Sequence, residues 1–346
     1  MSKFTVALII PTGIGAAIGG YAGDALPVAR SVASMCDRLI THPNVLNGAQ
    51  LYWPLDNTYY VEGYGLDRFA AREWGLQPVK QNRVGLLLDK AIEPELRLRH
   101  IQAADAARAT LGLNLTDYVV TDAPLEVELR TANSGASWGT IGNPGSLLRA
   151  AEKLIDSGGA EAIAVVARFP DDDSIELQNY RYGSGVDCLA GAEAVISHLI
   201  VRHFQIPAAH APALKPLAAD PQVSPRAAAE ELGYTFLPCV LVGLSRAPQF
   251  VTKKAASPDT IWSESVDIAI VPYSACGGSA TLSFATSTKI IAVTNNSTAI
   301  QVPPEPLGIK VTKVNSYLEA LGVLATYRAG VDFRALNPAI FSLRCL

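Results

Sequence analysis

The chain has 346 residues, 49% of them hydrophobic and 17% charged, which is enough apolar material for two domains or one large α/β unit. Its net charge of -4, with lysines and arginines scattered along the sequence, argues against a nucleic-acid partner. The apolar runs have the length of strands and fall far short of the roughly 20 residues that cross a bilayer, so we expect no membrane partner.

The five cysteines are spread through the chain and form no C-x-x-C pair, which argues against a zinc ribbon and against a disulfide framework. The sequence begins with Met-Ser-Lys and enters a strand pattern without the apolar segment of a signal peptide. We therefore expect reduced thiols and a cytoplasmic protein.

A glycine-rich turn follows the first predicted strand, over residues 4–10, and precedes a predicted helix over residues 25–40. Gly13 and Gly15 in this turn allow backbone N–H groups to approach an anion. The spacing is G-x-G-x-x-x-G, one residue longer than a dinucleotide fingerprint. A general anion-binding loop, a dinucleotide loop and a structural turn are therefore all open.

Residues 83–89, 95–111 and 117–122 have the patterns of a strand, a helix and a second strand. This order is a βαβ unit and predicts a parallel sheet. Ligands bind beyond the carboxyl ends of the strands in such sheets. Asp122, which ends the second strand, is therefore a candidate catalytic acid or base.

The densest polar stretch of the chain is residues 131–144, which precede a predicted helix with Asn143 as its N-cap. Asn133, Ser134 and Ser137 lie between glycines there and offer several hydrogen-bond donors to a carboxylate or phosphate. The alternative is an ordered turn that only caps the helix.

The clearest buried strand, residues 161–167, leads into Arg168 and then Asp171 and Asp172. The guanidinium of Arg168 has the geometry to clamp a carboxylate or phosphate. The cofactor is unknown, although Asp171 and Asp172 are candidates for binding Mg²⁺ together with substrate phosphates. A solvated acidic loop is the alternative interpretation.

A change of composition to Pro, Ala and His over residues 207–225 predicts a linker or a crossing between two halves. The predicted parts are an N-terminal α/β part, residues 1–206, and a C-terminal α/β part, residues 226–346, which shares a cleft with the first. The histidines of the predicted helix over 189–204 have no partner visible in the sequence, so we interpret them as surface or core residues.

The C-terminal part contains three further predicted strands, each followed by polar residues at its carboxyl end. Residues 236–244 lead to Arg246, residues 266–271 lead to Cys276, and residues 289–293 lead to Asn295 and Asn296. Gly277, Gly278 and Ser279 follow Cys276 and start a predicted helix, whose N-terminus attracts anions and lowers the pKa of a thiol.

Together these elements predict an α/β fold with mainly parallel, doubly wound sheets, helices on both faces, and one body or two halves. Because the polar clusters follow strands, we expect an enzyme that acts on a small anionic metabolite, carboxylated or phosphorylated, with Cys276 or Asp122 as acid, base or nucleophile. One alternative is a cofactor-independent racemase or epimerase that uses Cys188 and Cys276 as opposed thiols. Another is a non-catalytic metabolite sensor or assembly protein, and a homo-oligomer is also open.

Four motifs resemble a domain family of unknown function from cyanobacteria and plastid-bearing eukaryotes. They are Ile-Ile-Pro-Thr-Gly-Ile-Gly-Ala near the start, Asn-Ser-Gly-Ala-Ser-Trp-Gly and Ala-Val-Val-Ala-Arg-Phe-Pro-Asp-Asp in the middle, and Thr-Asn-Asn-Ser-Thr late in the chain. The resemblance extends over nearly the whole chain and implies a cytosolic or plastid-stromal protein. It implies no activity and no catalytic residue.

Overall fold

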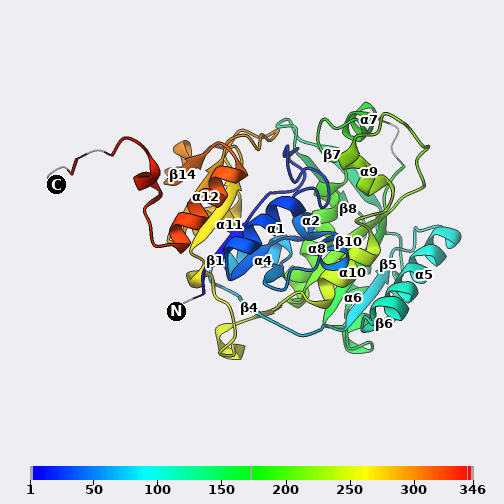
Figure 1. Cartoon of the computed structure of the whole chain (residues 1–346). Coiled ribbons are helices and arrows are strands. Elements are labelled where there is room, and N and C mark those ends of the chain that lie inside the picture. The colour runs from blue at the N-terminus through cyan, green and yellow to red at the C-terminus, as the bar shows by residue number, and fades with distance from the viewer. Residues whose placement is uncertain (1–2, 172–173, 341, 344–346) are drawn as a thin grey trace.

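In a computed structural model, which describes residues 3–171, 174–340 and 342–343, the apolar runs form two parallel sheets. The larger sheet has six strands in the order β14-β13-β12-β1-β2-β3. It joins the two ends of the chain, since blue β1 lies close to the yellow and orange C-terminal elements in Figure 1. Its strands are β1 (Thr5–Leu8), β2 (Arg38–Thr41), β3 (Thr58–Tyr60), β12 (Ile268–Pro272), β13 (Lys289–Val293) and β14 (Val311–Val314).

The smaller parallel sheet has four strands in the order β10-β9-β5-β6 and comes from the middle of the chain. Its strands are β5 (Val84–Leu88), β6 (Leu115–Val120), β9 (Ala162–Arg168) and β10 (Ala208–Ala213). The segment 207–225, predicted as a linker or crossing, therefore contains a strand. Ala209, Ala211 and Ala213 of this strand alternate into the core, which small side chains permit.

Helices cover both faces of both sheets, which confirms the predicted α/β fold with doubly wound parallel sheets. Successive β1 residues explain this arrangement, because Val6 and Leu8 face one core while Ala7 and Ile9 face the other. On the first face lie α1 (Leu26–Met35), α12 (Tyr317–Arg328), α5 (Pro94–Leu111) and α10 (Leu237–Ser245). On the second lie α4 (Gly63–Ala70), α11 (Ser279–Phe284), α6 (Pro144–Asp156) and α8 (Ala190–Phe204).

The prediction of a strand over residues 236–244 is wrong, because this segment forms α10. The run Leu-Pro-Cys-Val-Leu-Val-Gly-Leu is apolar throughout, and a run of this kind does not distinguish a buried strand from a buried helix. Every α10 residue except Pro238 is buried, since the helix packs against α3 (Ala49–Tyr52), α5 and the four-stranded sheet. Pro238, in the first turn, fits a helix start.

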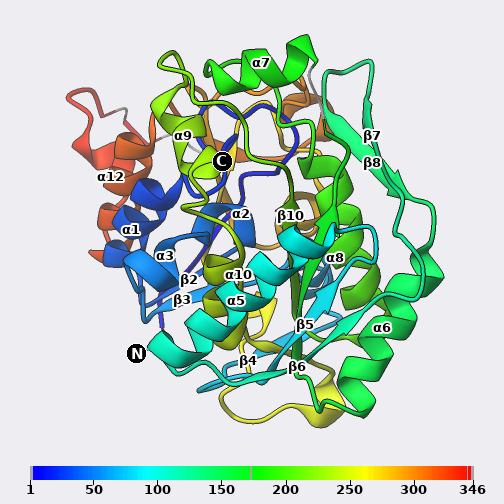
Figure 2. The ribbon, with the colours of Figure 1, turned by 90° about the vertical axis from the view of Figure 1, so that its right-hand side faces the viewer.

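The polar stretch 131–144, predicted as a binding segment or as an ordered turn that caps the helix, contains most of a β-hairpin made of β7 (Val127–Thr131) and β8 (Ser137–Ile141). Figure 2 shows this hairpin along the edge of the molecule, above α6. Its glycines serve packing, because a Cβ on Gly139 would lie 2.5 Å from the Cβ of Ala192 in α8. A Cβ on Gly191 would lie 2.2 Å from the Cα of Trp138 in the hairpin.

Shorter elements complete the structure. They are α2 (Pro43–Leu46), α7 (Ile175–Arg181), α9 (Pro225–Glu231), the antiparallel pair β4 (Gly75–Gln77) and β11 (Gln249–Val251), and 3-10 turns at Lys253–Ala255, Ser263–Ser265, Glu305–Leu307 and Phe333–Leu336. Within the described residues, no helix is both long enough and apolar enough to cross a bilayer.

Candidate functional site

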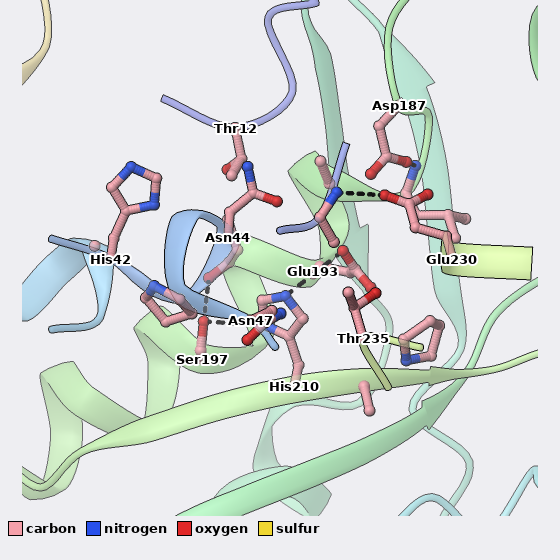
Figure 3. A pocket seen from close by; sticks show the side chains of 18 of the residues that line it. Thr12, His42, Asn44, Asn47, Asp187, Glu193, Ser197, His210, Glu230 and Thr235 are labelled. Carbon is pink, nitrogen blue, oxygen red and sulfur yellow. Dashed lines mark hydrogen bonds and ion pairs between the residues drawn. The ribbon is translucent and has the colours of Figure 1, made fainter. Parts of the chain in front are cut away.

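A cavity of about 690 Å³ lies beyond the carboxyl ends of β1 and β12, the two strands at which the order of the six-stranded sheet reverses. This reversal is the place where open α/β sheets bind ligands. Pro11 and Thr12 reach the cavity after β1, and Gly278 and Ser279 reach it after β12. The remaining walls come from α2, α4, α7, α8, α9 and β10. Figure 3 shows ten of the polar residues that line it.

One face of α8 forms a polar wall of this cavity. Glu193 and Ser197 lie one helical turn apart, His198 follows Ser197 directly, and all three side chains line the cavity. Apolar residues of α8, such as Ile196 and Ile200, are buried in the second core. The helix is therefore held by its apolar side and presents its few polar groups to the cavity.

Five of the lining residues form a connected chain of contacts that we call the histidine relay: Glu193, His210, Ser197, Glu62 and His198. Glu193 Oε2 lies 3.5 Å from His210 Nε2, and His210 Nδ1 lies 3.3 Å from Ser197 Oγ. Ser197 Oγ donates to Glu62 Oε1 over 3.4 Å, and the same carboxylate oxygen lies 3.0 Å from His198 Nε2. The relay joins α4, α8 and β10, and Figure 3 shows its Ser197–His210 part.

Glu62 is fixed at the start of α4. Its Oε2 accepts hydrogen bonds from Tyr64 N and Gly65 N at 2.8 and 3.1 Å, as an N-cap does, which leaves Oε1 for His198 and Ser197. The intervening Gly63 is required by this contact, because a Cβ there would lie 2.9 Å from His198 Nε2.

Two histidines of the cavity have pKa values shifted in opposite directions. Burial alone would lower the pKa of His198, but the hydrogen bond to Glu62 and the charges of Glu62 and Asp67 outweigh it, so the pKa is raised. Burial lowers the pKa of His42 to about 4. His42 Nε2 accepts a hydrogen bond from Ile10 N over 3.1 Å, so the neutral ring carries its proton on Nδ1.

Three carboxylates gather at another wall and form what we call the carboxylate cluster: Asp187, Glu193 and Glu230 (Figure 3). Burial and the charge of Glu193 raise the pKa of Asp187 to about 7. Burial and the charge of Asp187 raise the pKa of Glu230. Glu230 is held by Ala22 N and by Tyr180 Oη, which donates to its two oxygens at 2.8 and 2.9 Å.

The positive side chains along this cavity are already paired. Arg181 Nε donates to Glu231 Oε1 over 2.8 Å, and Lys215 Nζ lies 2.8 Å from Asp171 Oδ2. The carboxylate cluster has no such partner among the lysines and arginines of the described residues. The cavity therefore holds three carboxyl groups without a lysine or arginine of the described residues beside them, and burial makes Asp187 and Glu230 retain protons more readily.

Arg168 and Asp122, predicted as a ligand clamp and a catalytic acid, lie outside the cavity lining and are paired with other residues. Arg168 is largely buried and donates to Glu93 Oε2 over 3.0 Å and to Asp171 Oδ2 over 2.8 Å. Asp122 accepts a hydrogen bond from Arg149 Nε over 2.7 Å, and this contact, with Ser146, lowers its pKa.

The predicted magnesium ligands gain no partners that would complete a metal site. Asp171 pairs with Arg168 and Lys215, and Asp172 lies outside the described residues. Across the part of the chain that the structure describes, no group of three or more His, Cys, Asp or Glu residues could hold a metal ion.

The expectation that the helix N-terminus lowers the pKa of the Cys276 thiol is wrong. Cys276 is fully buried, its Sγ lies 3.5 Å from Tyr273 O, and burial raises its pKa to about 11. Cys188 is partly buried, and neither thiol belongs to the lining of the cavity.

The predicted glycines of the first loop shape that loop, and they do not line the cavity themselves. Gly13 and Gly15 have φ values of 71° and 59°, a backbone region that favours glycine. A Cβ on Gly13 would lie 2.6 Å from Ser137 Oγ, while Ser137 N donates to Gly13 O over 2.8 Å. The loop is thereby fixed to the hairpin and carries Thr12 to the cavity.

Of the other predicted binding residues, Gly278 and Ser279 line the cavity, and the rest lie away from it. Asn296 is buried, and it bonds to the backbone of Ile18 and to Tyr317 Oη at 2.7 Å, so it fastens the first loop to α12. A Cβ on Gly277 would lie 2.7 Å from Val302, which gives this glycine a packing role. Four predicted residues are exposed instead: Asn133, Ser134, Arg246 and Asn295.

Sequence reasoning missed most of the polar lining, including three of the five histidines of the chain: His42, His198 and His210. One signal was present, since Glu193, Ser197 and His198 interrupt the apolar pattern in the first three turns of α8. His210 was assigned to a linker, because alanines and prolines conceal the alternation of β10.

A family described as "Protein of unknown function (DUF3326)" matches residues 5–337. The chain belongs to this family. This result confirms the resemblance to a cyanobacterial domain of unknown function. A relative from Synechococcus sp. is 62% identical over 338 residues, which is 97% of this chain and 94% of the relative.

The relative from Synechococcus is named "Uncharacterized lipoprotein", and a lipoprotein is a protein with a lipid anchor. That name contradicts the expectation of a cytoplasmic or plastid-stromal location, which is therefore corrected. No solved structure matches this chain.

Proposed function

We propose that this protein is an enzyme that performs general acid–base chemistry on a small molecule in the cavity at the switch point of the six-stranded sheet. The observation that carries the proposal is the histidine relay, in which Glu62 and Glu193 each contact one histidine of the cavity wall. A carboxylate that orients an imidazole and stabilises its charged form is the usual device for making histidine an acid or base.

His198 is the proposed acid–base residue. Its Nε2 faces Glu62, which leaves Nδ1 as the nitrogen that can exchange a proton with a substrate, and the side chain is 42% exposed. A proton taken from the substrate onto Nδ1 creates an imidazolium that the Glu62 carboxylate stabilises. The raised pKa of His198 means that the contact with Glu62 favours the protonated ring, as the proposed imidazolium requires.

His210 supplies the second proton site of the relay. It reaches Glu62 through Ser197, whose hydroxyl can donate in one direction while it accepts in the other. A substrate that gives a proton to one histidine and receives one from the other leaves the net charge of the wall unchanged. This arrangement suits isomerisation, elimination or hydration better than a transfer that needs a bound anion.

The charge of the cavity favours a neutral or cationic substrate over the anionic metabolite predicted from the sequence. Arg168 and Arg246 lie outside its lining, and the two cations that line it, Arg181 and Lys215, are paired. An anion would meet Asp187, Glu193 and Glu230 without a compensating charge. Apolar residues such as Leu66, Leu177, Leu214 and Phe236 leave room for a hydrophobic body.

A screen with a chemical readout tests the proposal. Metabolites that raise the melting temperature are incubated with the protein in D2O, and mass spectrometry follows the incorporation of deuterium at carbon. Exchange that disappears in His198→Gln supports acid–base chemistry. Binding without any exchange or turnover would overturn it in favour of a metabolite sensor.

A serine nucleophile is the second candidate, because Glu193, His210 and Ser197 are connected in the order of a catalytic triad. Ser197 is only 2% exposed and shares its hydroxyl with Glu62 and Ala194 O, which argues against it. A fluorophosphonate probe decides the matter, since labelling of Ser197 requires a nucleophilic hydroxyl. The two-thiol racemase gains no support from Cys188 and Cys276, which do not line the cavity.

A further inference from the structure

The carboxylate cluster is unusual because it places three carboxyl groups along one cavity without a lysine or arginine from the described part of the chain beside them. Asp187 lies at the start of α8, Glu193 on its first turn and Glu230 on α9, and all three side chains line the same cavity (Figure 3). Ionised carboxylates are costly to bury unless a cation or several donors compensate them. Glu193 contacts His210 at 3.5 Å, and Glu230 receives Ala22 N and Tyr180 Oη. No lysine or arginine of the described residues completes the group.

Thr235 provides a second and independent observation at the same wall. Its Oγ1 is buried without a hydrogen-bond partner among the described residues, and the residue is 8% exposed. Thr235 lines the cavity, and Figure 3 shows it beside Glu193 and below Glu230. A buried hydroxyl without a partner costs free energy, so it indicates a group that supplies a hydrogen bond when the cavity is filled.

We propose that Asp187, Glu193, Glu230 and Thr235 bind the primary ammonium group of an amine whose apolar body occupies the rest of the cavity. This inference rests on the proposed function and names the class of its substrate. An ammonium group has three donors and no acceptor, which matches carboxylate oxygens and a hydroxyl oxygen. A metal ion fits less well, because the described residues contain no group that could hold one.

The titration of the cluster agrees with this assignment. Burial and mutual repulsion raise the pKa values of Asp187 and Glu230, so both retain protons more readily when no cation is present. A bound ammonium would replace those protons and restore the charged form. The groups that face Asp187 and Glu230 are Glu193 of α8, His210 of β10 and Tyr180 of α7.

Three ligands with chains of equal length show which head group the cavity prefers: n-hexylamine, n-hexanol and hexanoate. Calorimetric titration of the full chain at about pH 8 measures each affinity, since the amine, with a lysine-like pKa of about 10.4, is charged at this pH. We expect hexylamine to bind roughly tenfold to hundredfold more tightly than hexanol, as for hydrogen bonds between charged groups. Equal affinities for hexylamine and hexanol, or tighter binding of hexanoate, would overturn the proposal.

Two variants locate the effect. Glu230→Gln keeps an acceptor for Ala22 N and Tyr180 Oη but removes the charge, and it should abolish most of the preference for the amine. Thr235→Val removes a hydroxyl that has no partner, so it should leave the melting temperature unchanged or higher while weakening hexylamine several-fold. Glu152→Gln, on the exposed side of α6, is the matched control and should change nothing. An unchanged amine preference in both Glu230→Gln and Thr235→Val would place the amine elsewhere.

Divalent cations provide the last arm of the experiment. Mg²⁺, Ca²⁺ and Zn²⁺ as chlorides should neither stabilise the protein through this cluster nor displace hexylamine, and competition by any of them would replace the ammonium site with a metal site. Failure of the amine proposal can be distinguished from failure of the proposed acid–base function. Deuterium exchange into a neutral ligand would keep the acid–base enzyme and reject the amine, whereas tight amine binding without exchange would do the reverse.

Discussion

The two parallel sheets have equivalent switch points that are used in different ways. In the six-stranded sheet the gap between β1 and β12 opens into the cavity. In the four-stranded sheet the strand order reverses between β5 and β9, and Asp89 occupies the carboxyl end of β5 at this point. Asp89 is fully buried, its Oδ1 accepts from Ala91 N and Leu125 N at 3.0 Å, and its Oδ2 accepts from Arg168 N at 3.1 Å.

The difference teaches that a polar residue at a strand end is available to a ligand only if the protein leaves part of its hydrogen-bonding capacity unused. Asp89 and Arg168 use theirs on backbone groups, on Glu93 and on Asp171. At the other switch point, Thr235 Oγ1 has no partner among the described residues, and the carboxylate cluster has no cation. Two switch points of the same topology therefore differ: the one between β5 and β9 is filled by internal hydrogen bonds, and the one between β1 and β12 is a candidate binding site.

The largest effect should come from His198. We expect His198→Gln to slow deuterium exchange into a bound ligand by about 100-fold to 10,000-fold, the usual contribution of a positioned acid or base. The control is His203→Gln, on the same helix but exposed and outside the cavity, which should retain full exchange. Equal loss in both variants would mean that α8 itself had been disturbed.

Asp89 tests the closed switch point. Asp89→Ala leaves three backbone N–H groups without their carboxylate, so the free energy of unfolding in urea should fall by about 3 to 4 kcal/mol. Asp105→Ala, on the exposed side of α5, should change it by less than about 0.5 kcal/mol. If Asp89→Ala were as stable as Asp105→Ala but had lost ligand binding, the distinction between the two switch points would be wrong.

The pH dependence of stability sharpens the comparison further. The pKa of Asp187 is raised from 3.8 to about 7, first by burial and then by Glu193, so between these values the folded chain binds more protons than the unfolded chain. Its stabilising contribution is complete below the lower value and is lost as pH rises through the upper one, with a slope of at most about 1.4 kcal/mol per pH unit.

Urea denaturation of the wild type and Asp187→Asn at several pH values between about 4 and about 8 isolates this contribution. His42, whose pKa is lowered to about 4 by burial, contributes with the opposite sign, but it does so in both proteins and cancels in the difference. A difference that does not change with pH would show that Asp187 titrates as it does in the unfolded chain.

The smallest expected effect is that of Cys276. With a pKa of about 11, roughly 0.1% of this thiol is ionised at about pH 8, so iodoacetamide should label it far more slowly than a free thiol. Cys276→Ala should leave deuterium exchange unchanged, since the side chain does not line the cavity. Rapid labelling that a ligand prevents would return the thiol to the mechanism.

Local sequence patterns determined a large part of the architecture. The β-branched and apolar runs at 83–89, 161–167 and 289–293 correspond to β5, β9 and β13, because residues that are buried on both faces of a parallel sheet must be apolar. The rule that ligands bind beyond strand ends also placed Gly278 and Ser279 at the cavity. These features depend on each segment alone.

Only the tertiary structure decided which polar groups meet and which are already satisfied. Glu62 lies more than 130 positions before His198, yet the packing of α4 on α8 brings their side chains to 3.0 Å. Arg168 looked free in the sequence, but its partner is Glu93, the N-cap residue of α5, which lies 75 positions earlier in the chain. The segment 236–244 forms a helix, α10, that packs against α3, α5 and the four-stranded sheet, and these neighbours lie far from it in the sequence. A sequence pattern predicts which residues of a segment are buried. It does not predict their hydrogen-bond partners, because these come from elements far away in the chain.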